Sequence, residues 1–161
     1  MSNSNVILFN GRLLPASETF IRAQGEGLEK FTPYYVGARR VPGLTLPPDR
    51  TLVVNQGGLL GSVEEGLFKL YGFAPKLYRK LQQLSPVLVH AHFGVCGALA
   101  SPLKHILKVP MIVTFHGLDA TMTDSYARKN SLSTRIYLKR RETLKCEADL
   151  FIGVSDFIRQ N

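Results

Sequence analysis

The stretch VLVHAHFG at positions 87–94 decides the fold, because it is an apolar run that ends in polar residues and a glycine. Two further runs have the same character, Met111-Ile112-Val113 and Leu150-Phe151-Ile152. Their apolar residues are consecutive rather than alternating, which is typical of strands covered on both faces. Helix-period segments separate the runs, so the sequence predicts a series of βαβ units and an α/β fold with a parallel sheet.

The same alternation extends from this centre toward both ends of the chain. Further strands are expected at 6–9, 34–36 and 51–54, and helices at 17–31, 61–84, 96–107, 134–148 and from Asp156 onward. We expect Ser17 to cap the first helix, and Phe20, Ile21, Leu28 and Phe31 to be its buried face. The sequence therefore predicts one Rossmann-like domain over residues 1–161, with helices on both faces of the sheet.

Composition places the chain among ordinary globular domains. It has 45% hydrophobic and 20% charged residues, which argues against disorder. There is no apolar run long enough to span a bilayer, and the first residues do not resemble a signal peptide, so we expect a cytoplasmic location. The two cysteines, Cys96 and Cys146, lack a spacing that suggests a disulfide framework or a nucleophile.

The net charge of +8 predicts an anionic partner, for which nucleic acid, anionic lipid and phosphorylated ligands all qualify. Residues 61–108 carry six Lys or Arg residues against two acidic ones, which is half of the net surplus. Together with Phe68, Tyr71 and Phe73, this segment suggests peripheral binding to the inner face of a membrane. No nucleic-acid recognition motif is present, so we regard nucleic acid as an unlikely partner.

Polar residues follow the apolar runs, where an open parallel sheet binds its ligands. These candidates are Ser17, Glu18 and Thr19 after the first strand, His92, Phe93 and Gly94 after the fourth, His116, Gly117 and Asp119 after the fifth, and Ser155 after the last. Because the carboxyl ends of parallel strands meet at one edge, we expect all of them to lie on the same rim.

Four ordered motifs carry a family resemblance. They are Pro15-x-Ser17-Glu18-Thr19-Phe20-Ile21, Val89-His90-Ala91-His92-Phe93-Gly94, Val113-Thr114-Phe115-His116-Gly117-x-Asp119 and Ala148-Asp149-x-x-Ile152-x-Val154-Ser155. Together they resemble the N-terminal half of the family 4 glycosyltransferases, retaining enzymes of the GT-B fold that use nucleotide sugars. Residues 38–60 carry none of the resemblance. The loop before the first helix has only Gly11, where many family members have paired glycines.

The resemblance implies roles for the rim residues. His116 matches the family histidine that lies in the catalytic cleft near the transferred sugar. The other candidates would contact the acceptor or a diphosphate. The resemblance also implies that no cofactor and no metal are needed beyond the donor nucleotide sugar. A C-terminal domain would bind that donor, and it is absent from these 161 residues.

Simpler interpretations accompany several of these residues. His90 and His92 point to one face of a strand and could begin a metal site, although no further ligands are evident. Glu18 could merely compensate the dipole of the first helix, and Ser155 could cap the helix from Asp156. Glu18 and Glu26 have the spacing of the family's donor-site glutamates, but they lie in the other domain, so we interpret this match as chance.

The resemblance implies the acceptor side of a cleft that transfers a hexose from a nucleotide sugar to a saccharide or a lipid-linked acceptor. Such enzymes build cell-surface polysaccharide or glycolipid. Half a cleft neither neutralises the leaving diphosphate nor excludes water, so we expect no activity from the chain alone. The final helix stops within two turns, which suggests truncation. The alternative is a non-catalytic module that binds a separate donor domain, a glycolipid or an anionic membrane surface.

Overall fold

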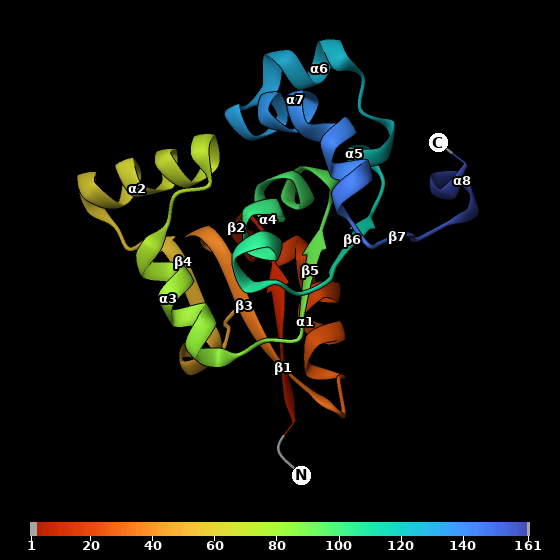
Figure 1. Cartoon of the computed structure of the whole chain (residues 1–161). Coiled ribbons are helices and arrows are strands. Elements are labelled where there is room, and N and C mark those ends of the chain that lie inside the picture. The colour runs from red at the N-terminus through yellow and green to blue at the C-terminus, as the bar shows by residue number, and fades with distance from the viewer. Residues whose placement is uncertain (1–2, 161) are drawn as a thin grey trace.

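The computed structural model describes residues 3–160, and its centre is a sheet of seven parallel strands (Figure 1). The strands are β1 (Ser4–Phe9), β2 (Arg12–Leu13), β3 (Phe31–Arg40), β4 (Thr51–Asn55), β5 (Leu88–His92), β6 (Met111–Phe115) and β7 (Leu150–Gly153). Their order is β2-β3-β1-β5-β6-β7, and β4 also pairs with β3. The predicted parallel α/β sheet is confirmed.

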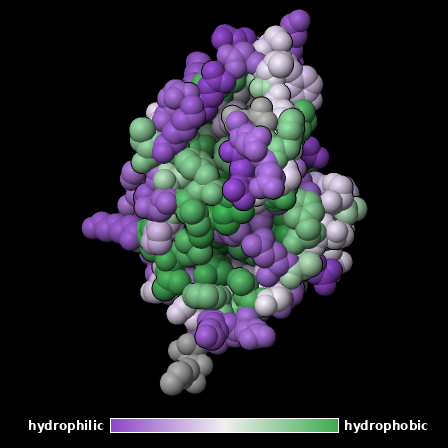
Figure 2. All heavy atoms as spheres, turned by 90° about the vertical axis from the view of Figure 1, so that its right-hand side faces the viewer, coloured by the Kyte–Doolittle hydropathy of each residue, from purple (hydrophilic) through white to green (hydrophobic). Residues whose placement is uncertain are grey.

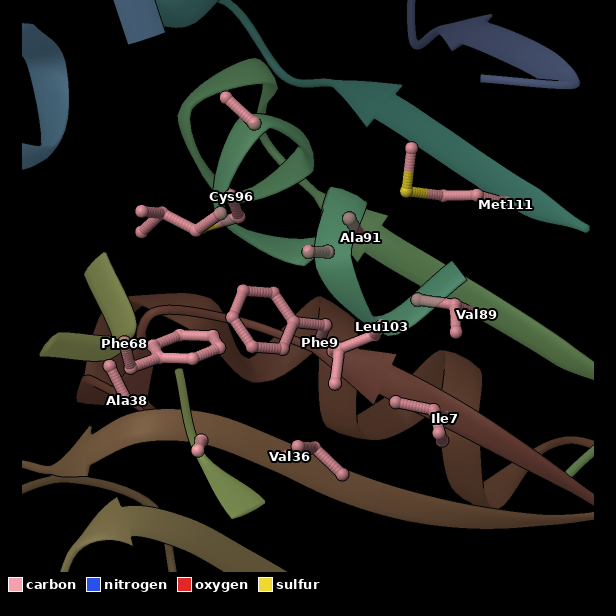
Figure 3. Close-up of a cluster of buried hydrophobic side chains, with 14 of the residues drawn as sticks. Ile7, Phe9, Val36, Ala38, Phe68, Val89, Ala91, Cys96, Leu103 and Met111 are labelled. Atoms are coloured by element: carbon pink, nitrogen blue, oxygen red, sulfur yellow. The ribbon is translucent and has the colours of Figure 1, made fainter. Parts of the chain in front are cut away.

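One face of the sheet carries the larger apolar core (Figure 3). It is covered by α2 (Gly58–Tyr71), α3 (Pro75–Leu84), α4 (Gly94–Leu107) and α7 (Leu132–Glu147). Phe9 of β1 and Phe68 of α2 meet here with their ring centroids 6.0 Å apart. Alternate residues of the central strands, such as Val89 and Ala91, are fully buried beneath α4. Burial of this surface supplies the main driving force for folding.

The opposite face carries a smaller core of seven buried residues around Leu8, Ile21 and Tyr35. It is covered by α1 (Thr19–Glu26), which contacts β3, and by the loop after β3. The remaining short elements are the 3₁₀ turns Ala16–Glu18 and Pro48–Arg50 and the helices α5 (Leu118–Thr121), α6 (Asp124–Asn130) and α8 (Asp156–Arg159). Helices therefore lie on both faces of the sheet, as predicted.

The side of the molecule that bears β7 is only partly covered. Among the described strands, β7 pairs with β6 alone, and Leu150, Phe151 and Ile152 are all exposed. Figure 2 shows apolar atoms gathered on this side, which is the right-hand side of Figure 1. Within residues 3–160, no helix combines the length and the apolarity needed to cross a bilayer.

The predicted helix at 17–31 needs correction. A 3₁₀ turn covers Ala16–Glu18, α1 ends at Glu26, and Phe31 already begins β3. Ser17 does not cap the helix: Glu18 is the N-cap residue, and no side chain caps α1. Of the expected apolar face only Ile21 is fully buried, while Phe20 is 40% and Phe31 is 39% exposed. Apolar residues continue at helical spacing across the turn into β3, so the periodicity alone predicts too long a helix.

The last predicted helix begins as expected. Ser155 is the N-cap of α8, and its hydroxyl accepts a hydrogen bond from the Ile158 amide at 3.3 Å. This is the simpler of the two interpretations of Ser155.

Candidate functional site

Three aromatic rings gather at the carboxyl edge of the sheet, and we call Phe20, Phe93 and His116 the aromatic rim. Phe20 comes from the start of α1, Phe93 from the β5–α4 junction and His116 from the end of β6. The His116 ring lies 4.6 Å from Phe20 and 4.7 Å from Phe93, between ring centroids. His116 and Phe93 are half-buried, so the rim presents an imidazole flanked by two apolar rings to the surface.

Behind the aromatic rim runs a ladder of histidines. His90 and His92 stack on one face of β5 with centroids 4.3 Å apart, and His92 stacks on His116 at 5.3 Å. The Nδ1 of His92 lies 3.1 Å from the Nε2 of His116. At the inner end, the Nε2 of His90 lies 2.8 Å from the hydroxyl of Thr114. The strand register produces this ladder, because His92 of β5 lies opposite Thr114 of β6.

Burial keeps the ladder neutral at physiological pH. Desolvation lowers the pKa of His90 to about 4 and that of His92 to about 3, and neighbouring imidazoles add to both effects. Burial also lowers the pKa of His116, although Asp119 opposes this effect. A neutral imidazole has one donor and one acceptor nitrogen, so each ring can take part in two directional hydrogen bonds.

Asp119 locks the loops of the rim together. One carboxylate oxygen accepts the Gly94 amide at 2.8 Å, and the other accepts the amides of His116 at 3.1 Å and Gly117 at 3.0 Å. Asp119 is only 6% exposed. The carboxylate and these backbone donors therefore satisfy one another, and the structure gives Asp119 a positioning role rather than an open ligand-binding one.

Backbone geometry at the rim is unusual at two positions. Phe93 has a φ of 74°, which costs a bulky residue of order 1–3 kcal/mol, and its amide donates to the Thr114 carbonyl at 2.7 Å. Gly117 has a φ of 146° and open space where a side chain would begin. Strain of this kind collects at functional sites, where the surrounding fold holds it in place. Gly94 is required for packing, since a Cβ there would lie 2.5 Å from the Phe115 ring.

Glu18 faces back toward the end of β1. Its Oε2 accepts a hydrogen bond from the side-chain Nδ2 of Asn10 at 2.5 Å. The Oδ1 of Asn10 in turn accepts a hydrogen bond from the backbone amide of Arg12 at 3.3 Å. Burial raises the pKa of Glu18, while Asn10 and Arg12 oppose the shift. Glu18 is the N-cap residue of α1, but its side chain makes no capping hydrogen bond and is engaged by Asn10 instead.

Cys96 lies beneath this pair as a structural thiol. Its Sγ accepts the Gly11 amide at 3.3 Å and donates to the side-chain oxygen of Asn10 at 3.5 Å. Burial raises the pKa of Cys96 to about 12, so the thiolate needed of a nucleophile does not form near neutral pH.

The remaining predicted residues lie on the same edge of the sheet but outside the aromatic rim. Ser17 and Thr19 are exposed at the start of α1, and Ser155 is exposed after β7. Glu26 lies at the opposite end of α1 from Glu18 and pairs with Arg50 at 3.0 Å and with the Tyr35 hydroxyl at 2.8 Å. The spacing of the two glutamates therefore does not create a shared site.

The histidine ladder provides no metal site on its own. Within residues 3–160, no group of three or more His, Cys, Asp or Glu side chains is placed to hold a metal ion. His90 and His92 instead direct ring nitrogens toward Thr114 and His116.

Two contacts of the site were not expected from the sequence. Phe20 was assigned to the buried face of the first helix, yet it lies against His116. Asn10, which is 4% exposed, connects the end of β1 to Glu18. The position of Asn10 directly after an apolar run was the available signal, whereas Phe20 depends on where α1 begins.

Comparisons with known proteins agree with this architecture. The model of Glycosyltransferase Family 4 matches residues 18–161, so the chain belongs to this family. Among solved structures, the chain is similar to sucrose-phosphate synthase from Thermosynechococcus elongatus, with a TM-score of 0.62 and 16% identity. This alignment covers 92% of the present chain and 42% of that protein, so the chain spans less than half of its length. A comparison with curated protein sequences found no match.

Proposed function

We propose that this chain forms the acceptor side of a glycosyltransferase cleft that transfers a hexose from a nucleotide sugar to a saccharide or a lipid-linked acceptor. The observation that carries the proposal is the half-buried, neutral His116 between Phe20 and Phe93, in a chain of family 4. The two phenyl rings offer apolar surfaces to the C–H faces of a sugar, and the imidazole offers a directional hydrogen bond to its oxygens. The product would be cell-surface polysaccharide or glycolipid, made at the cytoplasmic side of a membrane.

A second domain, on the same or another chain, would hold the donor and complete the cleft. The aromatic rim lies at the surface and does not line the cavity of about 630 Å³ that the fold contains between α2 and α3. Groups from an opposing domain would therefore be needed to neutralise the leaving diphosphate and to exclude water. No cofactor or metal is assigned to the transfer.

Ligand titrations followed by NMR test the proposal on the chain as it is. Saccharide acceptors should shift the side-chain resonances of Phe20, Phe93 and His116, and His116→Ala should weaken the response at least tenfold. His105→Ala is the matched control, because His105 is exposed on α4 and pairs with Glu147 instead. If saccharides at millimolar concentration left the resonances of the aromatic rim unchanged, this result would contradict an acceptor site. Rapid nucleotide-sugar turnover by the purified chain would contradict the need for a second domain.

The surface around α2 favours a further role in binding an anionic membrane. α2 lies at the left edge of Figure 1 and exposes Leu59 by 86%, Leu60 by 81% and Tyr71 by 75%. Leu60 lines the cavity between α2 and α3 together with Arg79 and Lys80. Apolar residues beside cations are the chemistry that an anionic lipid surface attracts. On this basis the chain would dock peripherally, either to reach a lipid-linked acceptor or as a non-catalytic module.

Vesicle sedimentation separates the contribution of the cations to membrane binding from that of the apolar residues. The chain should sediment with vesicles of phosphatidylglycerol and phosphatidylcholine, and much less with phosphatidylcholine alone. The Arg79→Gln/Lys80→Gln variant should reduce binding severalfold, whereas Arg22→Gln/Lys30→Gln, which removes the same charges elsewhere, should not. Equal sedimentation with neutral and anionic vesicles would remove the lipid role.

A further inference from the structure

The contact between His92 and His116 can hold only one hydrogen. The Nδ1 of His92 and the Nε2 of His116 are 3.1 Å apart, so one nitrogen donates and the other accepts. If His92 donates, His116 carries its own proton on Nδ1. If His116 donates, its Nδ1 is bare and His92 must carry its proton on Nε2, because burial keeps His92 neutral.

The surroundings of His92 distinguish these two arrangements. His92 is fully buried, and its Nε2 has no hydrogen-bond partner among the described residues. If His116 donated, the Nε2 of His92 would therefore carry a buried hydrogen without an acceptor. Orphaned buried N–H groups are rarer in folded proteins than acceptors with unused lone pairs. The arrangement in which His92 keeps a bare Nε2 and donates through Nδ1 is the less costly one.

The rest of the ladder is compatible with this assignment. The Nε2 of His90 faces the Thr114 hydroxyl, which can donate or accept and so imposes no tautomer on its neighbour. Stacking between His90 and His92, with an interplanar angle of 29°, holds the His92 ring against the sheet. The direction of the shared hydrogen bond is therefore fixed by the buried nitrogen of His92.

We propose that His92 is a positioning residue that holds His116 in the Nδ1–H tautomer. Because its Nε2 is shared with His92, His116 then presents a hydrogen-bond donor at Nδ1. The group that this nitrogen recognises must be an acceptor oxygen, such as a sugar hydroxyl oxygen or a phosphate oxygen. This inference rests on the proposed function for the identity of the ligand, whereas the tautomer itself is a property of the chain alone.

Long-range proton–nitrogen NMR of the full chain tests the tautomer directly. The sequence has only four histidines, at 90, 92, 105 and 116, so single substitutions assign every ring. At neutral pH we expect a pyrrole-type nitrogen at Nδ1 of His116 and a pyridine-type nitrogen at Nε2, with the same pattern for His92. A protonated Nε2 on His116 in the unmodified chain overturns the proposal without any variant.

Two substitutions distinguish positioning from simple packing. His92→Phe keeps a ring but removes the donor, and His116 should lose its exclusive Nδ1–H pattern and gain the Nε2–H form. His92→Asn keeps a donor near the place of Nδ1 and should preserve the original pattern. If His92→Phe leaves the tautomer of His116 unchanged in a folded chain, His92 does not set it. If His92→Phe does not fold, the unmodified chain and His92→Asn still decide the question.

The tautomer and the proposed function fail separately. The nitrogen shifts of His116 are measured without ligand, whereas the acceptor site is tested by saccharide-induced shifts of the aromatic rim. A correct tautomer with no saccharide response would contradict the function alone.

Discussion

Asp119 and Gly94 are joined by a hydrogen bond of 2.8 Å that ties the first turn of α5 to the first residue of α4. The two residues are far apart in the chain, and the bond between them is buried. The same carboxylate also holds the amides of His116 and Gly117, so one side chain fixes the conformation of the segment that carries the imidazole.

Asp119→Ala should lower the free energy of unfolding by about 3 kcal/mol, because it leaves buried backbone donors without an acceptor. Urea denaturation followed by circular dichroism measures this loss. Asp156→Ala is the control: Asp156 is exposed at the start of α8, and we expect a change within about 0.5 kcal/mol. Equal effects of the two substitutions would contradict a stabilising role for the hydrogen bonds of Asp119.

Gly117→Ala should destabilise the chain by about 1–2 kcal/mol, although there is room for the added methyl group. The cost comes from the backbone, since a φ of 146° is unfavourable for any residue with a Cβ. Gly66→Ala provides a matched comparison, because this glycine also has open space but lies inside α2. There the helix propensity of alanine should stabilise the chain by up to about 1 kcal/mol. Thermal unfolding should shift in opposite directions for the two variants.

Gly25→Ala should also destabilise the chain, but through packing. A Cβ at Gly25 would lie 2.7 Å from Leu8 and from the Tyr35 hydroxyl. Overpacking of this kind costs about 1–3 kcal/mol, which exceeds the gain of about 1 kcal/mol in helix propensity. An unfolding midpoint at or above that of the unmodified chain would show that α1 can move away from the sheet.

The histidine ladder makes stability depend on pH. His90 and His92 have folded pKa values of about 4 and about 3, below the ordinary value of 6.5, so the unfolded chain binds protons more readily. Their contribution to stability is complete above pH 6.5 and is lost as the pH falls toward about 4 for His90 and about 3 for His92. Within this range each histidine should lower the free energy of unfolding by about 1.4 kcal/mol for each unit by which the pH falls.

Unfolding measured between pH 7 and pH 5 follows this effect. His116, whose pKa is also lowered, adds to the slope, whereas Glu18, whose pKa is raised, opposes it at the acidic end. Glu26 and Glu65, whose pKa values are lowered, lose their contribution only below their ordinary value of 4.5. His92→Phe should lower this slope by up to about 1.4 kcal/mol per pH unit, because the variant removes one of the buried imidazoles. A slope unaffected by His92→Phe would mean that His92 becomes protonated within the folded chain.

The strand pattern could be predicted from the sequence because burial on both faces leaves consecutive apolar residues. Such runs around Val89 and Val113 each correspond to a buried strand of the sheet. The run around Phe151 also forms a strand, but its apolar side chains are exposed, so burial on both faces does not explain it. The end of the first helix could not be predicted in the same way. Phe31 is apolar at a helical spacing, and this pattern hides the stop signal of Gly27, which is the C-cap residue of α1.

The positions of the site residues were predictable, but their partners were not. His116 and Phe93 follow apolar runs, so their place at the carboxyl edge follows from a parallel sheet. That Asp119 turns inward to three amides, while Phe20 turns outward to His116, depends on loop conformation. A sequence motif shows which residue types occur together, but it does not distinguish a ligand contact from a hydrogen bond that shapes the loop.

The exposed edge of β7 has a consequence for how this chain behaves in solution. A strand of four residues with apolar side chains on both faces and neighbouring main-chain groups on one side only is a template for another strand. Natural sheets protect such edges with charges, prolines or covering elements. Among the described elements outside the sheet, α8 makes the main contacts with β7, so we expect edge-to-edge association of this chain at high concentration, which dilution or a partner at β7 should relieve.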